Sequence, residues 1–201
     1  MCSSQPLASV VVPTLNAGSG FEGLLAVLGA QDIPGGLELV IVDSGSMDGT
    51  VDRAREAGAR VLSVPRRQFN HGRTRNLAVQ ASRGQFVALT VQDAVPSSPG
   101  WLRHLLAPML ESPRVAGSYG LQMAPPEASL LARTRSLLWH QHHQHRAVKA
   151  LASETEFLGQ SPADRMDLVR FDNVTSCLRR SVWERFSFPE RDYAEDMGWS
   201  K

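Results

Sequence analysis

The sequence predicts an α/β fold, in which a mostly parallel, Rossmann-like sheet is covered by helices on both faces. The first observation is that short apolar runs, such as residues 8–12, 39–42 and 86–91, alternate with segments of helical spacing. The second is that these runs are apolar throughout, rather than at every second residue. Continuous apolar runs are typical of parallel strands that are buried on both faces.

Each predicted element carries a local signal. Strands are predicted at residues 8–12, 39–42, 60–64, 86–91 and 115–123. Helices are predicted at residues 21–31, 50–57, 73–82, 101–110, 130–151 and 181–185. Asp48 is the expected N-cap of the second of these helices, and Gly58 is its expected stop signal.

The composition is that of a soluble globular domain with a real core. The chain has 201 residues, of which 42% are hydrophobic and 20% charged. Lys and Arg together number 21 against 20 Asp and Glu, so the net charge of +1 gives no reason to expect a nucleic acid as partner. Two cysteines, Cys2 and Cys177, are too few for a disulfide framework and fit a reducing compartment.

The amino-terminal residues MCSSQPLAS lack the basic flank and long apolar stretch of a signal peptide. No apolar run in the sequence is long enough to span a bilayer. We therefore expect a cytoplasmic protein without a transmembrane segment, which works in part at the inner face of the membrane.

Basic residues are concentrated in one acid-free interval, residues 57–92. This interval contains Arg60, Arg66, Arg67, Arg73, Arg75 and Arg83. Two interpretations are open: a solvated basic face, or a patch that binds a phosphorylated ligand.

Polar residues directly follow three predicted strands. Thr14 and Asn16 follow the first strand, Asp43 the second, and Asp93 the strand at 86–91. In parallel sheets, ligands bind beyond the carboxyl ends of the strands, so these residues are expected to share one crevice. A carboxylate there can accept from a nucleoside, and a second can bind a hard divalent cation. The alternative for each Asp is a turn or helix cap.

Five segments together resemble the family 2 inverting glycosyltransferases of GT-A fold. They are VVVPTLNAG, ELVIVDSGSMDGT, HGRTRNLAVQASRG, FVALTVQDAVPSSPGWL and YAEDMGW, in the order in which the family has them. The resemblance runs from about Ala8 to the last residue. The HGRTRN segment and the QDA variant of the metal motif are most similar to the rhamnosyltransferase branch.

The resemblance implies a set of roles. On the sugar-donor side, Thr14 and Asn16 would line the nucleoside pocket, and Asp43 would accept from the pyrimidine imide. Arg75 would lie near the diphosphate, and Gln92 is also expected to bind the donor. Asp93 matches the last acid of the family's D-x-D metal motif and implies Mg²⁺ or Mn²⁺, although Gln92 stands where that motif has its first acid. Asp196 matches the catalytic base. Glu195, Asn173 and Ser176 are expected on the acceptor side.

The resemblance also implies an organisation and a reaction. Residues 1–125 are expected to form the nucleotide-sugar half, and residues 126–201 the acceptor half of the same domain, truncated at its carboxyl end. The implied reaction moves a sugar, in the favoured case L-rhamnose from dTDP-rhamnose, to a glycan or lipid-linked glycan acceptor with inversion.

Three other functions remain open. The first is a nucleotide-binding GT-A domain without turnover, and the second a nucleotidyltransferase, although PTLNAGSG lacks the basic residues that its signature loop needs. The third is an interaction module built on the His-rich helix. A metal site formed by His140, His142, His143 and His145 is weighed against a solvated helix surface.

Overall fold

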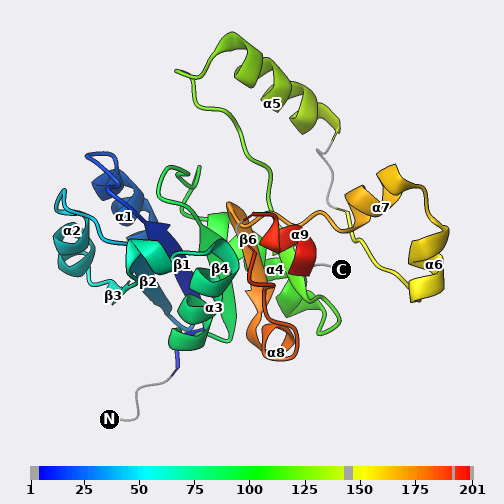
Figure 1. Cartoon of the computed structure of the whole chain (residues 1–201), viewed down its shortest axis with the longest axis horizontal. Helices are drawn as coiled ribbons and strands as arrows, with labels where there is room; N and C mark the ends of the chain where they lie inside the picture. Colours follow the sequence, from blue (N-terminus) through cyan, green and yellow to red (C-terminus); the bar gives the residue numbers. More distant parts are fainter. Residues whose placement is uncertain (1–4, 143–146, 192, 200–201) are drawn as a thin grey trace.

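A six-stranded sheet forms the centre of the molecule (Figure 1). The structure is a computed structural model and describes residues 5–142, 147–191 and 193–199. The strand order is β3-β2-β1-β4-β6-β5. The strands are β1 (Ala8–Thr14), β2 (Leu37–Asp43), β3 (Arg60–Ser63), β4 (Phe86–Thr90), β5 (Gly117–Tyr119) and β6 (Thr175–Arg179). The strands β1 to β4 pair in parallel, and β6 is antiparallel to both β4 and β5. The predicted α/β class with a mostly parallel sheet is confirmed.

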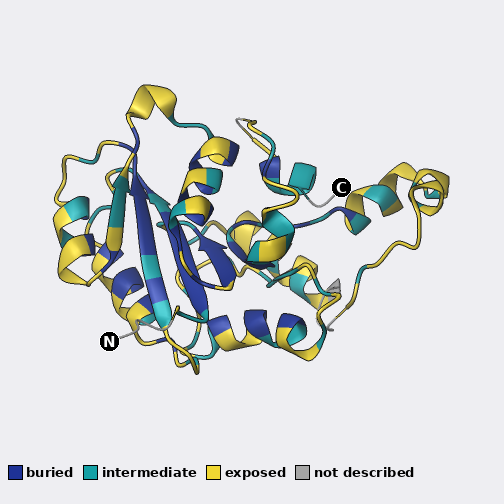
Figure 2. Ribbon diagram, turned by 90° about the horizontal axis from the view of Figure 1, so that it is seen from below, coloured by how far each residue is buried: buried dark blue, intermediate teal, exposed yellow. Residues whose placement is uncertain are grey.

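The central strands are apolar at most positions, because both of their faces are covered. In β1, Val10 and Val12 join the core cluster that contains the helices α1 (Phe21–Gly29) and α4 (Trp101–Glu111), whereas Val11 points to the other face. That second face is covered by α3 (His71–Ala81), and α2 (Thr50–Glu56) packs on the first. Figure 2 shows the buried strands between these helices.

The register of the strands brings their polar ends to one edge. Thr14 lies opposite Asp43, and Asp43 lies opposite Ser63 on the other side. Thr90, at the end of β4, lies opposite Thr175, where the antiparallel β6 begins. The segments that precede β6 and follow β4 therefore meet at the edge that carries Asp43.

The second half of the chain departs from the prediction in three places. The prediction of one helix over residues 130–151 is wrong in length. The helix α5 spans Leu130–His142, and residues 147–152 are not helical. Residues 143–146 lie outside the described residues. Two short helices then follow, α6 (Glu154–Gly159) and α7 (Pro162–Leu168), which begin at the capping side chains of Ser153 and Ser161. The strand β6 was not predicted. The last helices are α8 (Arg180–Trp183) and α9 (Glu195–Trp199).

The predicted N-cap of α2 is corrected by one residue. Gly49 occupies the cap position with a φ of 82°, a left-handed conformation that favours glycine. Asp48 still serves the helix start, because its carboxylate accepts from the backbone N–H of Thr50 at 3.1 Å. The local chemistry expected of Asp48 is thus present, although Gly49 is the boundary residue.

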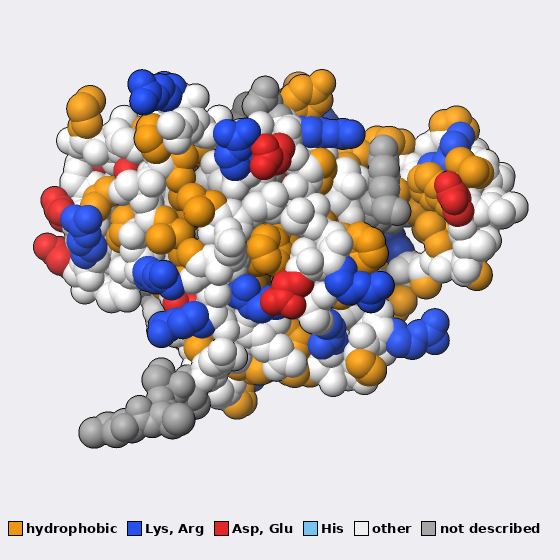
Figure 3. All heavy atoms as spheres, turned by 60° about the horizontal axis from the view of Figure 1, so that its bottom comes forward, with side chains coloured by type: hydrophobic (Ala, Val, Ile, Leu, Met, Phe, Trp, Pro, Cys, Tyr) orange, Lys and Arg blue, Asp and Glu red, His pale blue; other side chains and the backbone are white. Residues whose placement is uncertain are grey.

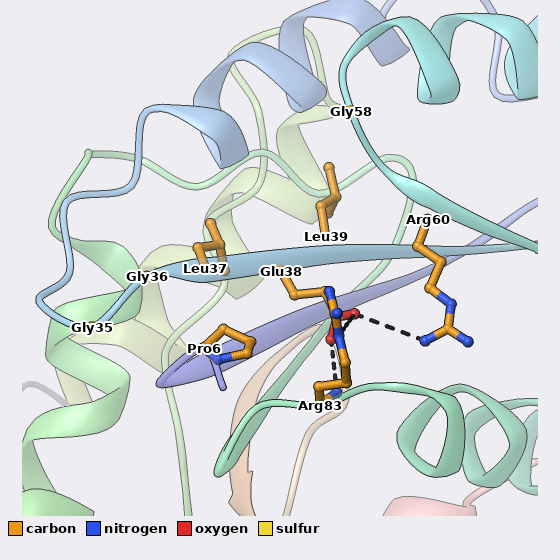
Figure 4. Close-up of a pocket in the computed structure, with 9 residues that line it drawn as sticks. All are labelled: Pro6, Gly35, Gly36, Leu37, Glu38, Leu39, Gly58, Arg60 and Arg83. Carbon is orange, nitrogen blue, oxygen red and sulfur yellow. Dashed lines mark hydrogen bonds and ion pairs between the residues drawn. The ribbon is translucent and has the colours of Figure 1, made fainter. Parts of the chain in front are cut away.

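At the opposite edge of the sheet, two arginines of the acid-free interval are used for structure. Figure 4 shows Glu38 of β2 between Arg60 and Arg83, in a pocket of about 330 Å³. The Glu38 carboxylate accepts from Ser9 Oγ at 2.8 Å and from the backbone N–H of Arg83 at 2.7 Å. Burial raises the pKa of Glu38, but these hydrogen bonds outweigh burial and hold the pKa below its usual value. Arg60 and Arg83 are therefore not available to a ligand at the carboxyl edge.

Gly84 lies at this edge in close contact with the backbone of β1, so a side chain there would collide with β1. An added Cβ would lie 2.5 Å from the carbonyl carbon of Ala8, and closer still to the nitrogen of Ser9. We predict that Gly84→Ala lowers the free energy of unfolding by about 2–4 kcal/mol, because backbone must move to accept it. Urea denaturation measures this change.

The matched control is Gly23→Ala in α1, where an added Cβ meets nothing within 4 Å. This variant should be neutral or more stable by about 0.5–1 kcal/mol, since alanine favours helix. Equal effects of the two substitutions would contradict the proposed close approach at Gly84.

Candidate active site

Asp43 is the organising residue of the loop that follows β2. Its Oδ1 accepts from the backbone N–H groups of Gly45 and Ser46, both at 2.9 Å, and its Oδ2 accepts from Thr14 Oγ1 at 3.0 Å and from Ser46 Oγ. Burial raises the pKa of Asp43, but the hydrogen bonds outweigh it and hold the pKa below its usual value. Asp43 is therefore a buried carboxylate that stays ionised at neutral pH.

The loop after β1 is joined to the same structure. Asn16 donates its backbone N–H to Ser46 Oγ at 2.8 Å, and its side-chain Oδ1 accepts from the backbone N–H of Met47 at 2.9 Å. Asn16 has a φ of 45°, which asparagine tolerates better than most residues. Gly18 donates its N–H to Asp48 at 2.9 Å. The two loops that were expected to line a nucleoside pocket are thus fixed to each other.

Gln92 connects the end of β4 to the end of β1. Its Oε1 accepts from the backbone N–H of Leu15 at 2.8 Å, and its Nε2 donates to the carbonyl of Leu15 at 3.2 Å. A carboxylate can only accept at both atoms, so an acid in this position could not make the same pair of bonds. Gln92 therefore holds the loop after β1 in place, next to Asp93.

Asp93 is the acid of this edge that remains open to a ligand. It is exposed and makes no hydrogen bond or ion pair with any residue that the structure describes. It lies on the wall of a long open groove of about 2780 Å³, which is also lined by Trp101, Tyr119 and Trp199. One free carboxylate on the wall of an open groove fits a hard cation that takes its other ligands from a diphosphate and water.

A buried network surrounds the predicted catalytic residue. Arg75 of α3 forms an ion pair with Glu195 of α9, and their side chains are 7% and 6% exposed. Asn173 donates its side-chain amide to Glu195 at 3.1 Å and its backbone N–H to Asp196 at 3.4 Å. Ser176 donates to the Asn173 side chain at 3.4 Å. The four residues around Asp196 therefore hold one another rather than facing the groove directly.

The charges in this network act on Asp196. Burial raises the pKa of the Asp196 carboxyl, and the negative charge of Glu195 adds to this increase. Arg75 keeps one N–H uncommitted, because its buried Nε has no hydrogen-bond partner among the described residues. Asp196 is thus a more basic carboxylate than an exposed aspartate, and Arg75 retains a group that a phosphate oxygen can bind.

The helix α3 holds the whole segment that leads to Asp196. Asn76 donates to the carbonyl of Phe188 at 2.8 Å, and its Oδ1 accepts from the Phe188 N–H at 2.9 Å and from Trp183 Nε1 at 2.9 Å. Gly72 lies so close to Pro189 that an added Cβ would collide with the carbonyl of Pro189. Sequence reasoning assigned no role to Asn76 or Ser46; Asn76 stands in the HGRTRN segment, but its partners are 107 and 112 residues away.

The remaining arginines of the acid-free interval do not form one patch. Figure 3 shows Lys and Arg side chains spread across one face of the molecule. Arg73 forms an exposed ion pair with Glu190 at 2.9 Å. Arg66 and Arg67 are exposed in the short 3₁₀ helix that follows β3, at the same edge as Asp43.

The histidine run that was weighed as a metal site against a solvated helix surface falls largely outside the described residues. His143 and His145 belong to residues 143–146, and the side chain of His142 is not described either. Among the described residues, no group of three or more His, Cys, Asp or Glu side chains converges as a metal site. In that part of the chain, no helix has the length and apolar character needed to cross a membrane.

The sequence and the fold both match a known protein family. The profile of glycosyl transferase family 2 matches residues 9–154, and the chain belongs to this family. The sheet with its covering helices is the GT-A arrangement found in its structural neighbours.

Two curated relatives are rhamnosyltransferases. The chain is 30% identical over 194 residues to the O-antigen chain rhamnosyltransferase RfbN of Salmonella typhimurium, covering 94% of this chain and 58% of the relative. It is also 30% identical over 205 residues to the O-antigen chain rhamnosyltransferase WbaN of Salmonella anatum, covering 96% of this chain and 59% of the relative. The chain thus spans less than two thirds of the length of either relative.

Two solved structures have the same fold. Staphylococcus aureus TarS 1–349 superposes with a TM-score of 0.64 at 21% identity, over 96% of this chain and 53% of that one. The mannosyltransferase PcManGT from Pyrobaculum calidifontis, in complex with GDP-Man and Mn²⁺, superposes with a TM-score of 0.62 at 22% identity, over 97% and 51%.

The buried position of the Arg75–Glu195 pair leads to a stability prediction. Arg75→Ala should lower the free energy of unfolding by about 3–5 kcal/mol, because it leaves the Glu195 carboxylate buried without its cation. Urea denaturation at neutral pH measures the change.

The matched control is Arg73→Ala, two residues earlier in the same helix. Its ion pair with Glu190 is more than half exposed, so the loss should stay below about 1 kcal/mol. If Arg73→Ala cost as much as Arg75→Ala, burial would not be what makes the Glu195 pair important.

Proposed function

We propose that this protein transfers a sugar from a nucleotide diphosphate to a glycan acceptor with inversion at the anomeric carbon. The proposal rests on one observation: an open carboxylate that can hold a cation and the network around the predicted base lie at the same edge of the sheet. The open carboxylate of Asp93 follows β4, and the Asp196 network is joined to the segment before β6, which pairs with β4. A leaving diphosphate and an attacking hydroxyl need these two groups at neighbouring positions.

The sugar donor is proposed to bind across the ends of β1, β2 and β4. Thr14, Asn16 and Asp43 would form the wall of the nucleoside pocket, and Gln92 would keep that wall in position through Leu15. Asp43 would accept from the imide of a pyrimidine. Its oxygens already accept four hydrogen bonds, which hold the loop in place, so the hydroxyl of Thr14 or Ser46 would turn away from Oδ2 when the imide binds.

A divalent cation, Mg²⁺ or Mn²⁺, would be held by Asp93 together with oxygens of the donor diphosphate. When bound, such a cation supplies positive charge to the departing diphosphate. The uncommitted Nε of Arg75 would bind a diphosphate oxygen beside it, and this assigns Arg75 two partners, Glu195 and the donor. Gln92 supplies no anionic ligand, because its side chain is a neutral amide, and both ends of that amide are bound to Leu15.

Asp196 would act as the general base. Its carboxylate takes the proton of the acceptor hydroxyl while that oxygen attacks the anomeric carbon, and the nucleoside diphosphate leaves with the electron pair of the broken C–O bond. Glu195, Asn173 and Ser176 would fix the position of Asp196 through their hydrogen bonds. The raised pKa of Asp196 increases its affinity for that proton.

The favoured donor is dTDP-L-rhamnose, because two relatives at 30% identity are O-antigen chain rhamnosyltransferases. The acceptor would be a growing surface glycan, free or lipid-linked, lying in the groove lined by Trp101, Tyr119 and Trp199. The proposed location is the cytoplasm, at the inner membrane face when the acceptor is lipid-linked.

The general-base role is tested by Asp196→Asn in a transfer assay. We expect kcat to fall by about 10²- to 10⁴-fold, while the affinity for the nucleotide stays within about twofold. Because the carboxyl pKa is raised, the wild-type rate should increase as the pH rises through that pKa, and this dependence should be lost in the variant. Asp52→Asn, an exposed change on α2, is the control.

An Asp196→Asn variant as active as wild type would overturn the assignment of the base. A wild type that binds nucleotide but neither hydrolyses nor transfers the sugar would favour the nucleotide-binding domain without turnover.

Calorimetric titration tests the donor site and its metal separately. With dTDP, UDP and GDP, each with and without Mn²⁺, we expect pyrimidine nucleotides to bind more tightly and Mn²⁺ to strengthen binding. Asp93→Asn should remove the strengthening of nucleotide binding by Mn²⁺. We expect the apparent affinity for Mn²⁺ to fall by about 10- to 100-fold. The control is Asp32→Asn, an exposed acid on the surface ion pair with Arg103.

If Mn²⁺ strengthened binding equally in wild type and Asp93→Asn, Asp93 would not be the metal ligand. If no nucleotide bound to the folded protein, the proposed donor site would be refuted as a whole.

A further inference from the structure

The helix α5 exposes its leucines to solvent and contacts the rest of the protein through Ser136 and Trp139. Leu130, Leu131, Leu137 and Leu138 are 77%, 72%, 52% and 52% exposed. At 100° per residue, these four positions fall within one stripe of about 120° on the helix surface. An ordinary surface helix has the reverse orientation, with its apolar stripe toward the core.

Contacts on the opposite side of α5 fix this orientation. Ser136 accepts from the backbone N–H of Ala124 at 2.9 Å and donates to the carbonyl of Gln122 at 3.3 Å. The Trp139 ring lies 4.3 Å from the guanidinium carbon of Arg170. Figure 1 shows α5 standing apart from the sheet at the end of a long connection from β5. The leucine stripe therefore faces away from the body of the molecule.

Basic residues border the leucine stripe on both sides. Helical spacing places Arg133 on one border and Arg135 on the other, where Arg135 also reaches the rim of the groove. Both are exposed, and neither forms an ion pair with any residue that the structure describes. The sequence has no Asp or Glu from residue 128 to residue 153.

We propose that α5 docks on the surface of an anionic phospholipid bilayer, with its leucines among the acyl chains and its two arginines at the headgroups. An apolar stripe with arginines along its borders is the pattern of a helix that lies in the membrane interface. The charge of the segment is complementary to anionic lipid. A protein partner or a second copy would have to offer acids along both borders to match the arginines.

The proposed docking of α5 would place the membrane beside the groove that was assigned to the acceptor. Ser136 and Trp139 of α5 also line the groove that was assigned to the acceptor. A bilayer held against the outer side of α5 would lie beside the groove, so a lipid-linked glycan could extend from the membrane into it. The docking itself does not depend on the transfer activity, and its failure leaves the nucleotide titration unaffected.

The test is flotation of the full 201-residue chain with vesicles. We expect binding to phosphatidylglycerol vesicles and little binding to phosphatidylcholine vesicles, with binding weakened by added salt. The double variant Leu137→Ser/Leu138→Ser should reduce partitioning at least about tenfold, because two exposed leucines no longer enter the bilayer. The double variant Arg133→Ser/Arg135→Ser should lose about fivefold per arginine.

Matched controls carry the same chemical changes elsewhere. Leu110→Ser/Leu158→Ser alters two leucines that are 57% and 59% exposed on α4 and α6, and Arg55→Ser/Arg103→Ser removes the same charge from other helices. All of these side chains are exposed, so unchanged thermal melting is expected and separates loss of docking from loss of folding.

Four results would overturn the proposal. The first three are no binding to anionic vesicles, equal binding to neutral vesicles, and equal losses of vesicle binding in the control and α5 variants. A fourth is a concentration-dependent dimer in sedimentation analysis that Leu137→Ser/Leu138→Ser dissociates, because the stripe would then be covered by a second copy of the chain.

Discussion

The buried ion pair between Arg75 and Glu195 is the interaction on which the two halves of the site depend. It connects α3, in the first half of the chain, to α9, which carries Asp196. Without the cation, the Glu195 carboxylate would remain buried and unpaired, and the hydrogen bond from Asn173 would not compensate for the lost ion pair. Because the buried Nε of the same guanidinium has no hydrogen-bond partner among the described residues, the group that holds α9 in place is also the group that we propose to bind a donor phosphate.

On the proposed donor side, most of the polar groups already have their hydrogen-bond partners within the protein. Asp43 accepts four hydrogen bonds, and the Gln92 amide uses both of its ends on Leu15. Such groups lose little conformational freedom when a ligand arrives, because their positions are already determined. Asp93 differs from them in having no partner among the described residues, which suits a group whose partner is brought by the ligand. The site thus combines a rigid wall with one open carboxylate.

Sequence reasoning was most successful where apolar runs end on polar residues. It placed Thr14, Asp43 and Asp93 at one edge, because strand ends are visible in the hydrophobic pattern. It missed β6, whose buried positions include Thr175 and Ser176, since their burial depends on pairing with a distant strand. It also extended α5 too far, because 130–151 has few breakers. The ion pair of Arg75 could not be foreseen, as its partner lies 120 residues away and Glu190 was an equally plausible acid.

The contact between Gly72 and Pro189 has a consequence for how the site can move. With no side chain between them, the first turn of α3 and the chain at Pro189 are in backbone contact, and neither can slide past the other. Asn76, one turn further along α3, fixes Phe188 as well. Any movement of α3 must therefore carry Phe188 and Pro189 with it as one body. Ala194, with a φ of 55° just before α9, holds a left-handed backbone conformation that is uncommon for a residue other than glycine, so the approach to α9 is strained as well as tightly packed.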